Sequence, residues 1–180
     1  LDYIEVNHGV DFPKLKRPIK DKYIAIGPNA TSGCKEWVYE NWVILTKLLI
    51  KSGYTVVCLS QRPYPIEGAI NIVGEPLSKV ANYLHHADYF IGLGSGLSWL
   101  NWAIGKHTHM INGFSENGHE FNTNITRIMN DNVCFPCWTN RNFTFDAGDW
   151  DWCPIHKGTE KQHICQKSIT PLQVYSSIIK

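Results

Sequence analysis

Residues 23–35 read YIAIGPNATSGCK, an apolar run that ends in Gly-Pro and opens into a loop of small residues. A short apolar run bounded by such a turn signal is typical of a buried strand. Residues 37–52 then place apolar side chains on one stripe at helical spacing, and residues 55–59, TVVCL, form a second apolar run. This succession of strand, helix and strand predicts a right-handed βαβ crossover.

The same alternation continues outward along the chain. Its strands are continuously apolar rather than alternating, which indicates burial on both faces. The sequence therefore predicts an α/β fold, a doubly wound parallel sheet of the Rossmann-like kind with helices on both faces. The further predicted strands and helices are residues 71–73, 77–84, 89–93, 97–104, 108–112 and 170–179.

Residues 113–168 interrupt this alternation. They are rich in Asn, Trp, Cys, Phe and Asp, poor in aliphatic residues, and too long for an ordinary loop. We interpret them as an aromatic, cysteine-rich insertion near the end of the chain. The predicted organisation is a linker segment, a Rossmann-like core, this insertion, and a C-terminal helix that returns to the core: residues 1–21, 22–112, 113–168 and 169–180.

Composition argues against several classes of protein. The 180 residues are 43% hydrophobic and 18% charged, which predicts a well-formed core. The net charge of +1 argues against a nucleic-acid partner, because such proteins usually carry a strong basic excess. No apolar run approaches the ~18 residues that a membrane span needs. Residues 1–5 do not resemble a signal peptide, and the missing initiator Met suggests a fragment or a processed chain. The eight histidines and the Cys-x-x-Cys motif favour a reduced compartment, so we expect a cytoplasmic protein, whereas the Asn-x-Thr sequons at Asn29, Asn124 and Asn142 are compatible with secretion.

Two loops at predicted strand ends are candidates for binding phosphate. They span residues 27–35 and 92–98, each between a strand and a helix. Doubly wound sheets bind ligands at the carboxyl ends of their strands, where small residues let backbone amides approach an anion at a helix N-terminus. Lys35 would add a point charge for a diphosphate. Neither loop matches the P-loop or the dinucleotide fingerprint, so a pair of tight turns is the alternative interpretation.

Four cysteines in the insertion predict a metal site. Four thiolates around a tetrahedral ion suit structural zinc or a mononuclear iron centre, and such a site would staple a segment that lacks an aliphatic core. His156 or His163 could replace one thiolate. Two alternatives remain open, a pair of disulfides and a redox sensor with exposed thiols. The predicted metal ligands are Cys134, Cys137, Cys153 and Cys165.

Two stretches resemble a known family. Residues 26–37, in which Lys35 is followed closely by Trp37, are similar to the start of the donor domain in ADP-heptose glycosyltransferases. Residues 87–100 are similar to the strand, loop and helix that contact the diphosphate in that family. Within it, the chain resembles the autotransporter heptosyltransferase group over roughly residues 22–178. The motifs that carry this second resemblance are Ser95 to Trp99, Cys134 to Trp138, Asp149 to Pro154, and Cys165 with Thr170 and Pro171.

The resemblance implies the C-terminal, donor-binding half of a GT-B glycosyltransferase. It implies that residues 22–112 bind a nucleotide sugar, and that the four cysteines hold one structural iron, with zinc as the alternative. In that family the acceptor domain and the acidic catalytic base lie in the N-terminal half, so no catalytic residue is assigned and this chain alone is not expected to turn over. The implied contacts are Lys35 on the diphosphate, backbone amides of residues 95–98 around it, and Glu75 near the ribose. The implied donor-binding residues are Thr31, Lys35, Glu75, Ser95, Gly96, Leu97 and Ser98.

The predicted function is transfer of a sugar, heptose by resemblance, from an ADP-sugar to a protein hydroxyl such as that of an autotransporter. The full-length protein is expected to be a homo-oligomer. Residues 94–99 read GSGLSW where other ADP-heptose transferases carry Asp-Thr-Gly-Leu-x-His, so this motif does not carry over the family's sugar specificity. The alternative function is a non-catalytic interaction module stapled by a four-cysteine metal site.

Overall fold

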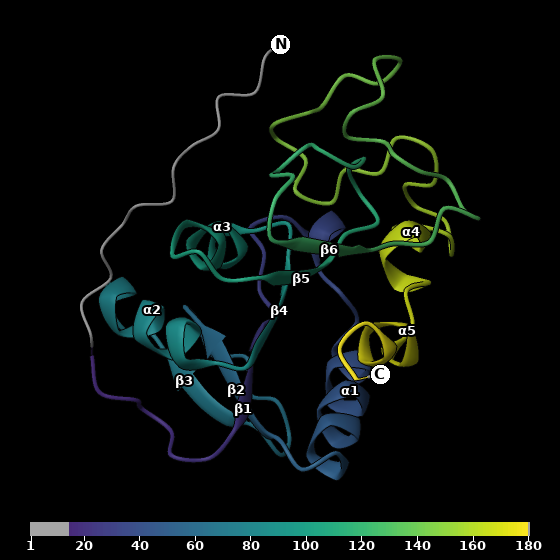
Figure 1. Cartoon of the computed structure of the whole chain (residues 1–180). Coiled ribbons are helices and arrows are strands. Elements are labelled where there is room, and N and C mark those ends of the chain that lie inside the picture. The colour runs from purple at the N-terminus through teal and green to yellow at the C-terminus, as the bar shows by residue number, and fades with distance from the viewer. Residues whose placement is uncertain (1–14, 180) are drawn as a thin grey trace.

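A parallel sheet of six strands forms the centre of the molecule, in the order β3-β2-β1-β4-β5-β6 (Figure 1). The computed structural model describes residues 15–179, and the first part of the predicted linker, residues 1–14, lies outside that range. Each pair of neighbouring strands runs parallel. The strands are β1 (Tyr23–Gly27), β2 (Thr55–Ser60), β3 (Ile70–Val73), β4 (Tyr89–Leu93), β5 (Thr108–Ile111) and β6 (Ile125–Ile128).

Helices cover both faces of this sheet, and the predicted doubly wound α/β fold is confirmed (Figure 1). One face carries α1 and α5, which contact each other, and the other carries α2 and α3. The predicted start of the last helix is correct, since Thr170 caps α5 and Pro171 is its first residue. The helices are η1 (Gly33–Lys35), α1 (Tyr39–Lys51), α2 (Leu77–His86), α3 (Gly96–Ala103), α4 (Ile164–Lys167) and α5 (Pro171–Ser176).

The central strands are buried on both faces. In β1, Ile24 and Ile26 belong to the core under α1 and α5, whereas Tyr23 and Ala25 belong to the core under α2. All four side chains are 0% exposed. Because burying a large apolar side chain contributes roughly 1.5–3 kcal/mol, these two cores dominate the stabilisation of the sheet. Two-sided burial is also the reason that the strands read as unbroken apolar runs.

The sequence does not predict β6 or α4. β6 reads ITRI, and of its residues only Ile128 is fully buried, so its own pattern is too weak to mark a strand. It joins the sheet by pairing with β5, where Met110 lies opposite Arg127 and Ile111 opposite Ile128. A stretch inside the predicted insertion therefore extends the sheet as its edge strand.

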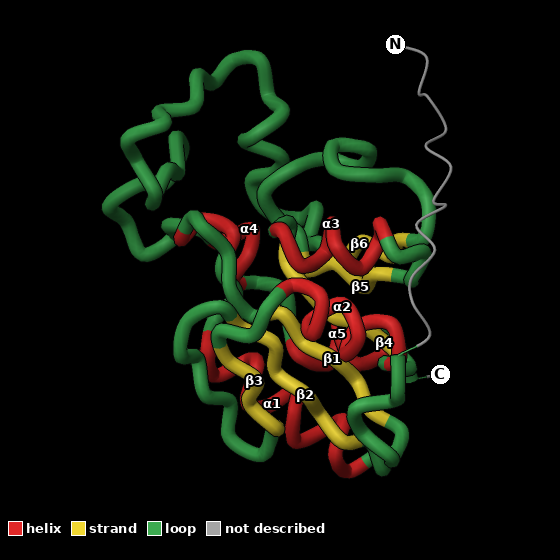
Figure 2. Tube along the Cα trace, turned by 90° about the vertical axis from the view of Figure 1, so that its left-hand side faces the viewer, coloured by secondary structure: helices red, strands yellow, loops and turns green. Residues whose placement is uncertain are grey.

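The remainder of residues 113–163 forms what we call the loop-rich lobe, on the side of the carboxyl ends of the strands (Figures 1 and 2). Residues 129–163 contain no helix or strand. Aromatic rings pack together in their place, with ring centroids 4.5 Å apart for Trp138 and Phe145 and 5.4 Å apart for Phe145 and Trp152. The aromatic residues of this lobe thus build a small core of their own.

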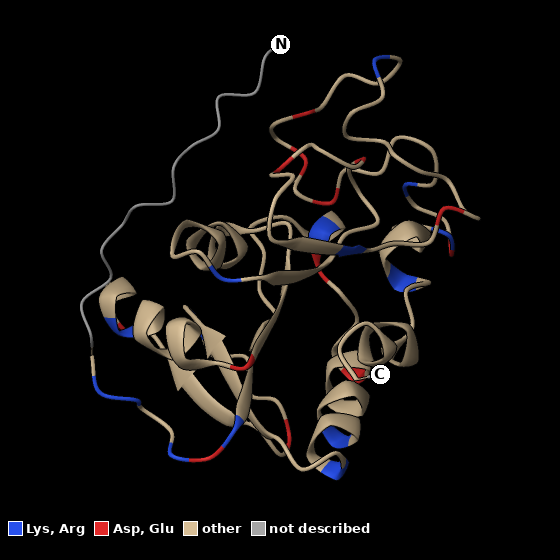
Figure 3. Ribbon diagram, viewed as in Figure 1, with Lys and Arg blue, Asp and Glu red and all other residues tan. Residues whose placement is uncertain are grey.

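Neither the described helices nor the distribution of charged positions along the chain marks a special surface. No helix within residues 15–179 is long and apolar enough to cross a membrane. Figure 3 shows basic and acidic positions interspersed along the ribbon. This mixture of signs agrees with the net charge of +1.

Candidate functional site

The loops that follow β1 and β4 lie side by side at the point where the strand order reverses. Gly27 and Gly92 are register partners there. A Cβ at Gly92 would lie 2.6 Å from Ser98 Oγ, and a Cβ at Gly27 would lie 3.1 Å from Leu97. Open α/β sheets bind ligands in the crevice at this switch point. We call residues 27–35 and 92–98 the first and second switch-point loops.

The second switch-point loop turns directly into α3. Ser98 Oγ donates to the carbonyl of Leu93 at 2.6 Å, the Ser95 amide donates to the same carbonyl at 2.7 Å, and the Ser98 amide donates to the Ser95 carbonyl at 3.1 Å. Two of the four predicted cradle amides are therefore already bonded within the loop. Gly96 and Leu97 begin the helix, where amides have no carbonyl in a preceding turn and favour an anion.

Lys35 ends the short helix η1 in the first switch-point loop. Its half-buried ammonium lies 5.5 Å from the ring centroid of Trp138 and 5.8 Å from that of Phe114. Cation–π contacts of this kind orient an ammonium without neutralising it. Within residues 15–179 Lys35 forms no ion pair, so its charge remains available to an anion.

Thr31 and Glu75 are the predicted donor-binding residues that remain, and they lie on different loops. Thr31 is exposed in the first switch-point loop. Glu75 follows β3, two strands away from β1, and its carboxylate accepts a hydrogen bond from Lys79 at 2.7 Å. No contact among the described residues joins Glu75 to Lys35. Lys35 and residues 95–98 thus lie on the loops that follow the adjacent strands β1 and β4, whereas Glu75 follows β3 at the side of the sheet.

Asn29 has no role in the predictions from sequence, yet it lies in the first switch-point loop. Both polar atoms of its side-chain amide are buried, and neither has a hydrogen-bond partner among the described residues. Leaving a buried polar group unpaired costs about 1–3 kcal/mol, so such a group calls for a ligand, a water or a further segment of protein. Asn29 is therefore an additional candidate for this site.

A buried ion pair supports the second switch-point loop. Arg127 of β6 donates to Glu120 at 2.6 Å, and the two side chains are only 6% and 8% exposed. Glu120 also accepts from Ser115 Oγ at 3.0 Å and from Asn112 Nδ2 at 3.3 Å. A Cβ at Gly94 would lie 3.0 Å from the Glu120 carboxylate, so this network lies directly against the loop. No sequence signal marks the pair, because it forms only when β6 joins the sheet.

The four predicted metal ligands lie near one another without converging on a single point. All are free thiols. Burial, together with the neighbouring Cys134 and Cys153 thiols, raises the pKa of Cys137 to about 11 and that of Cys165 to about 12. A bound cation relieves such repulsion between thiolates, so the donor set suits a thiolate-binding metal. Among residues 15–179, however, no three His, Cys, Asp or Glu side chains are arranged as a metal-binding group, and the metal site remains a prediction.

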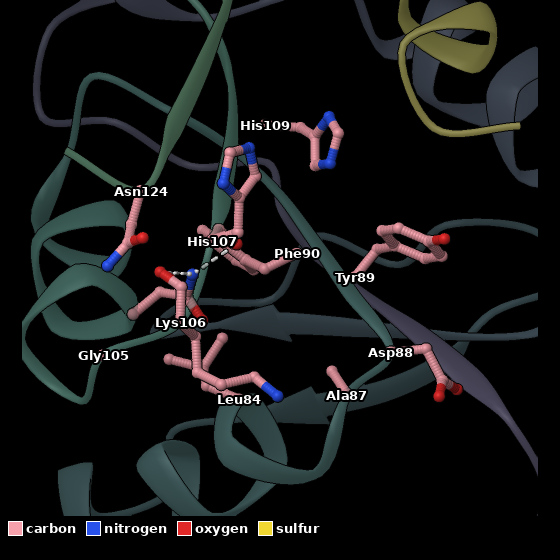
Figure 4. Close-up of a pocket in the computed structure, with 11 residues that line it drawn as sticks. Leu84, Ala87, Asp88, Tyr89, Phe90, Gly105, Lys106, His107, His109 and Asn124 are labelled. Carbon is pink, nitrogen blue, oxygen red and sulfur yellow. Dashed lines mark hydrogen bonds between the residues drawn. The ribbon is translucent and has the colours of Figure 1, made fainter. Parts of the chain in front are cut away.

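A separate cavity of about 350 Å³ opens at the opposite edge of the sheet, at the starts of β4 and β5 (Figure 4). No predicted donor-binding residue lines it. His107 and His109 stand close together in Figure 4, with ring centroids 5.1 Å apart, and His109 Nδ1 lies 3.2 Å from Ser177 Oγ. Burial, with a smaller effect from the neighbouring His107, lowers the pKa of His109 to about 4. The neutral imidazole of His109 is therefore assigned a structural role.

The sequence of this chain is similar to a protein family and to several known proteins. The model of glycosyltransferase family 9 (heptosyltransferase) matches residues 7–142. The autotransporter heptosyltransferase Aah of Escherichia coli is 36% identical over 179 residues, which cover 91% of this chain and 46% of Aah. The inactive autotransporter heptosyltransferase BimC of Burkholderia thailandensis is 29% identical over 188 residues, which cover 99% of this chain and 44% of BimC.

A solved structure agrees with these matches. The crystal structure of dodecameric iron-containing heptosyltransferase TibC from Escherichia coli, in complex with ADP-D-beta-D-heptose, superposes with a TM-score of 0.81 at 33% identity. The match covers 92% of this chain and 46% of that one. The chain therefore spans less than half the length of the relatives it matches, and the resemblance stated from its motifs is confirmed.

Arg127→Met should lower the free energy of unfolding by about 3–5 kcal/mol, because it leaves the Glu120 carboxylate buried without its partner. The matched control is Lys47→Met, which removes an exposed ion pair with Glu67 and should cost less than about 1 kcal/mol. The double variant Glu120→Leu/Arg127→Met should recover much of the loss. Chemical denaturation measures all three, and an Arg127 variant as stable as the control would contradict the supporting role.

Folding should weaken as the pH falls from about 6.5 towards 4, in part through His109. The unfolded chain takes up a proton near the ordinary pKa of about 6.5, whereas the folded imidazole does so only near 4, so acid favours the unfolded state. At pH 4 this amounts to roughly 3 kcal/mol. His109→Gln should flatten that part of the curve of stability against pH in urea denaturation, and an unchanged slope would argue against it.

Proposed function

The chain belongs to glycosyltransferase family 9, the heptosyltransferases, and we propose that it is the donor-binding half of an enzyme that transfers heptose from ADP-heptose to a protein hydroxyl. One observation carries the proposal: two loops of small residues follow the adjacent strands β1 and β4 at the switch point of the sheet, and the first of them holds Lys35, which forms no ion pair among the described residues. The complex of TibC with ADP-D-beta-D-heptose supports the same class of donor.

The proposed chemistry of this half is stabilisation of the leaving group. Transfer of the sugar builds negative charge on the nucleotide diphosphate. Lys35 binds one phosphate as a point charge, and the Gly96 and Leu97 amides at the start of α3 bind the other. Both groups are in place before the donor binds, because aromatic rings orient Lys35 and Leu97 packs close to Gly27. Charges and dipoles fixed in advance lower the barrier most effectively.

The other predicted donor-binding residues take lesser roles in this proposal. Ser95 and Ser98 shape the second switch-point loop through their internal hydrogen bonds. Thr31 and Asn29 contact the donor from the first loop, where the unpaired amide of Asn29 gains a partner. Glu75 reaches the ribose only after leaving Lys79, so it contributes least.

We assign the acceptor site and the acidic catalytic base to the part of the relatives that this chain does not cover. Among the described carboxylates near the switch point, Glu120 is buried and paired with Arg127, which makes it a support rather than a base. In this proposal the chain binds and orients the donor, and the whole enzyme carries out the transfer.

The proposed cofactor is one structural iron ion, with zinc as the alternative. TibC is an iron-containing relative, and four thiolates suit either metal. The ion would neutralise the thiolates and cross-link the loop-rich lobe, whose residues 129–163 have no helix or strand to hold them. The residues that would hold it are Cys134, Cys137, Cys153 and Cys165.

We also propose the partners and the location of the whole protein. TibC is dodecameric, which supports a homo-oligomer for the full-length protein. The relatives Aah and TibC are named autotransporter heptosyltransferases, which supports an autotransporter as the protein acceptor. Such an acceptor would be modified in the cytoplasm.

A second candidate function is a non-catalytic interaction module stapled by the cysteine metal site. BimC favours it, because that relative is named inactive although it aligns with 99% of this chain. Binding of the donor separates the two candidates, since an interaction module has no reason to keep a nucleotide-sugar site.

Calorimetric titration of the chain with ADP, ADP-heptose, ADP-glucose, UDP-glucose and GDP-mannose should show saturable binding of the adenine compounds alone. Lys35→Ala should weaken that binding at least about tenfold, because it removes a charge-assisted contact worth about 1.5–3 kcal/mol. Lys47→Ala, on α1 and paired with Glu67, is the control and should bind normally. Equal affinity of Lys35→Ala and the unaltered chain would reject the role of Lys35, and no binding of any compound would favour the interaction module.

Elemental analysis of the purified chain should find about one iron or zinc ion per molecule. Cys137→Ser should lose the ion and destabilise the loop-rich lobe, because one thiolate ligand is missing. Cys58→Ser is the control for metal content, since Cys58 lies on β2 in the apolar core and is not one of the four proposed ligands. Fully folded protein without metal would contradict the site.

A further inference from the structure

The side-chain amide of Gln166 joins three segments that are distant in sequence. Gln166 is 1% exposed. Its Oε1 accepts from the Gly113 amide at 2.7 Å, and its Nε2 donates to the Lys35 carbonyl at 2.8 Å and more weakly to the Ile111 carbonyl at 3.4 Å. Both ends of one buried amide are thus used, one at the end of β5 and the other at the residue proposed to bind the diphosphate.

The backbone that follows β5 packs directly against α4, the helix that carries Gln166. Gly113 follows the strand, and a Cβ at Gly113 would overlap the backbone carbonyl of Cys165. The backbone of α4 therefore lies directly against the chain that leaves β5, with no side chain between them. Gln166, the next residue after Cys165, projects from this contact towards Lys35.

The loop-rich lobe holds the first switch-point loop at a second place. Ser32 Oγ donates to the Trp150 carbonyl at 2.7 Å, and the Gly33 amide donates to the same carbonyl at 2.9 Å. Gly33 is also so close to the Asp151 carboxylate that a side chain would collide with it. The three residues of η1 are therefore fixed at their start by residue 150 and at their end by Gln166.

We propose that Gln166 is a positioning residue for the nucleotide diphosphate. It fixes the backbone of Lys35, and the aromatic rings of the lobe then orient the ammonium. Affinity for the donor is thereby coupled to the cysteine-bearing segment, because Cys165 and Gln166 are neighbours on α4. The inference rests on the proposed role of Lys35 and deepens it by naming what holds that lysine in place.

Substitutions that keep the size of residue 166 but change its hydrogen bonds distinguish a positioning role from simple filling of the core. An apolar side chain of the same length would fill the space and leave the Lys35 carbonyl and the Gly113 amide without their partner. An ionised glutamate would still accept from Gly113 but could not donate to Lys35, so the titration is run well above the ordinary pKa of a carboxyl group. Gln166→Met and Gln166→Glu therefore remove the bond to Lys35 in two different ways, and only the second keeps the bond to β5.

The experiment is calorimetric titration of ADP into the full chain and its variants, with metal content and unfolding measured on the same samples. Gln166→Met and Gln166→Glu should each weaken ADP binding about tenfold while metal content stays unchanged. Gln162→Met is the matched control, because it removes a hydrogen bond to Gly158 in the same lobe without touching Lys35, and it should bind ADP normally. In a Lys35→Ala background the Gln166 substitutions should add little, which a general loss of stability would not reproduce.

The outcomes distinguish this inference from the proposed function. If the unaltered chain fails to bind ADP, both the proposed function and the positioning role of Gln166 are rejected. If ADP binding is weakened by Lys35→Ala but normal in both Gln166 variants, the positioning role alone is wrong. If both Gln166 variants unfold, or if their effect adds in full to that of Lys35→Ala, the amide serves folding and the inference is overturned.

Discussion

The close approach of β1 and β4 at Gly27 and Gly92 is the constraint on which the rest of the molecule depends. Neither position has free room for a Cβ, and Gly92 has less room than Gly27. The approach sets two loops beside each other and brings the start of α3 against the first of them. Two cations lie at the first loop: Lys35 lies within it, and Arg62 donates to the Ala30 carbonyl while paired with Glu36. A methyl group at Gly92 would displace Ser98 or Phe90, and with them the helix that faces the proposed diphosphate.

The fold is predictable from the sequence because its signals are local. Apolar runs mark the five strands from β1 to β5, and helical spacing marks the helices between them. The weak strand β6 is not predictable, because its polar middle residues carry no strand signal and its position depends on β5. α4 is likewise a single turn, too short to show a period, and it is placed by the close contact of Cys165 with Gly113.

The candidate site is predictable where it coincides with a strand-to-helix junction, and it is hidden elsewhere. Residues 95–98 come directly after β4, and Lys35 lies in the loop after β1, so the general behaviour of doubly wound sheets points to both loops, whose role in binding remains a proposal. Glu120 and Gln166 gain their roles only through partners that the fold brings to them. The cysteines are an intermediate case. Their spacing predicts a shared metal ion, but the described thiols are not arranged as a metal-binding group.

The hydrogen bond from Gln166 to Lys35 spans 131 residues of sequence, and this separation has a consequence for synthesis on the ribosome. The chain emerges from its N-terminus, so the strands β1 to β5 are available to pair before residue 166 exists outside the ribosome. The first switch-point loop reaches its final shape only after the cysteine-bearing segment has folded back onto it. A nascent chain could therefore form its sheet before the Lys35 carbonyl gains the hydrogen bond that fixes it.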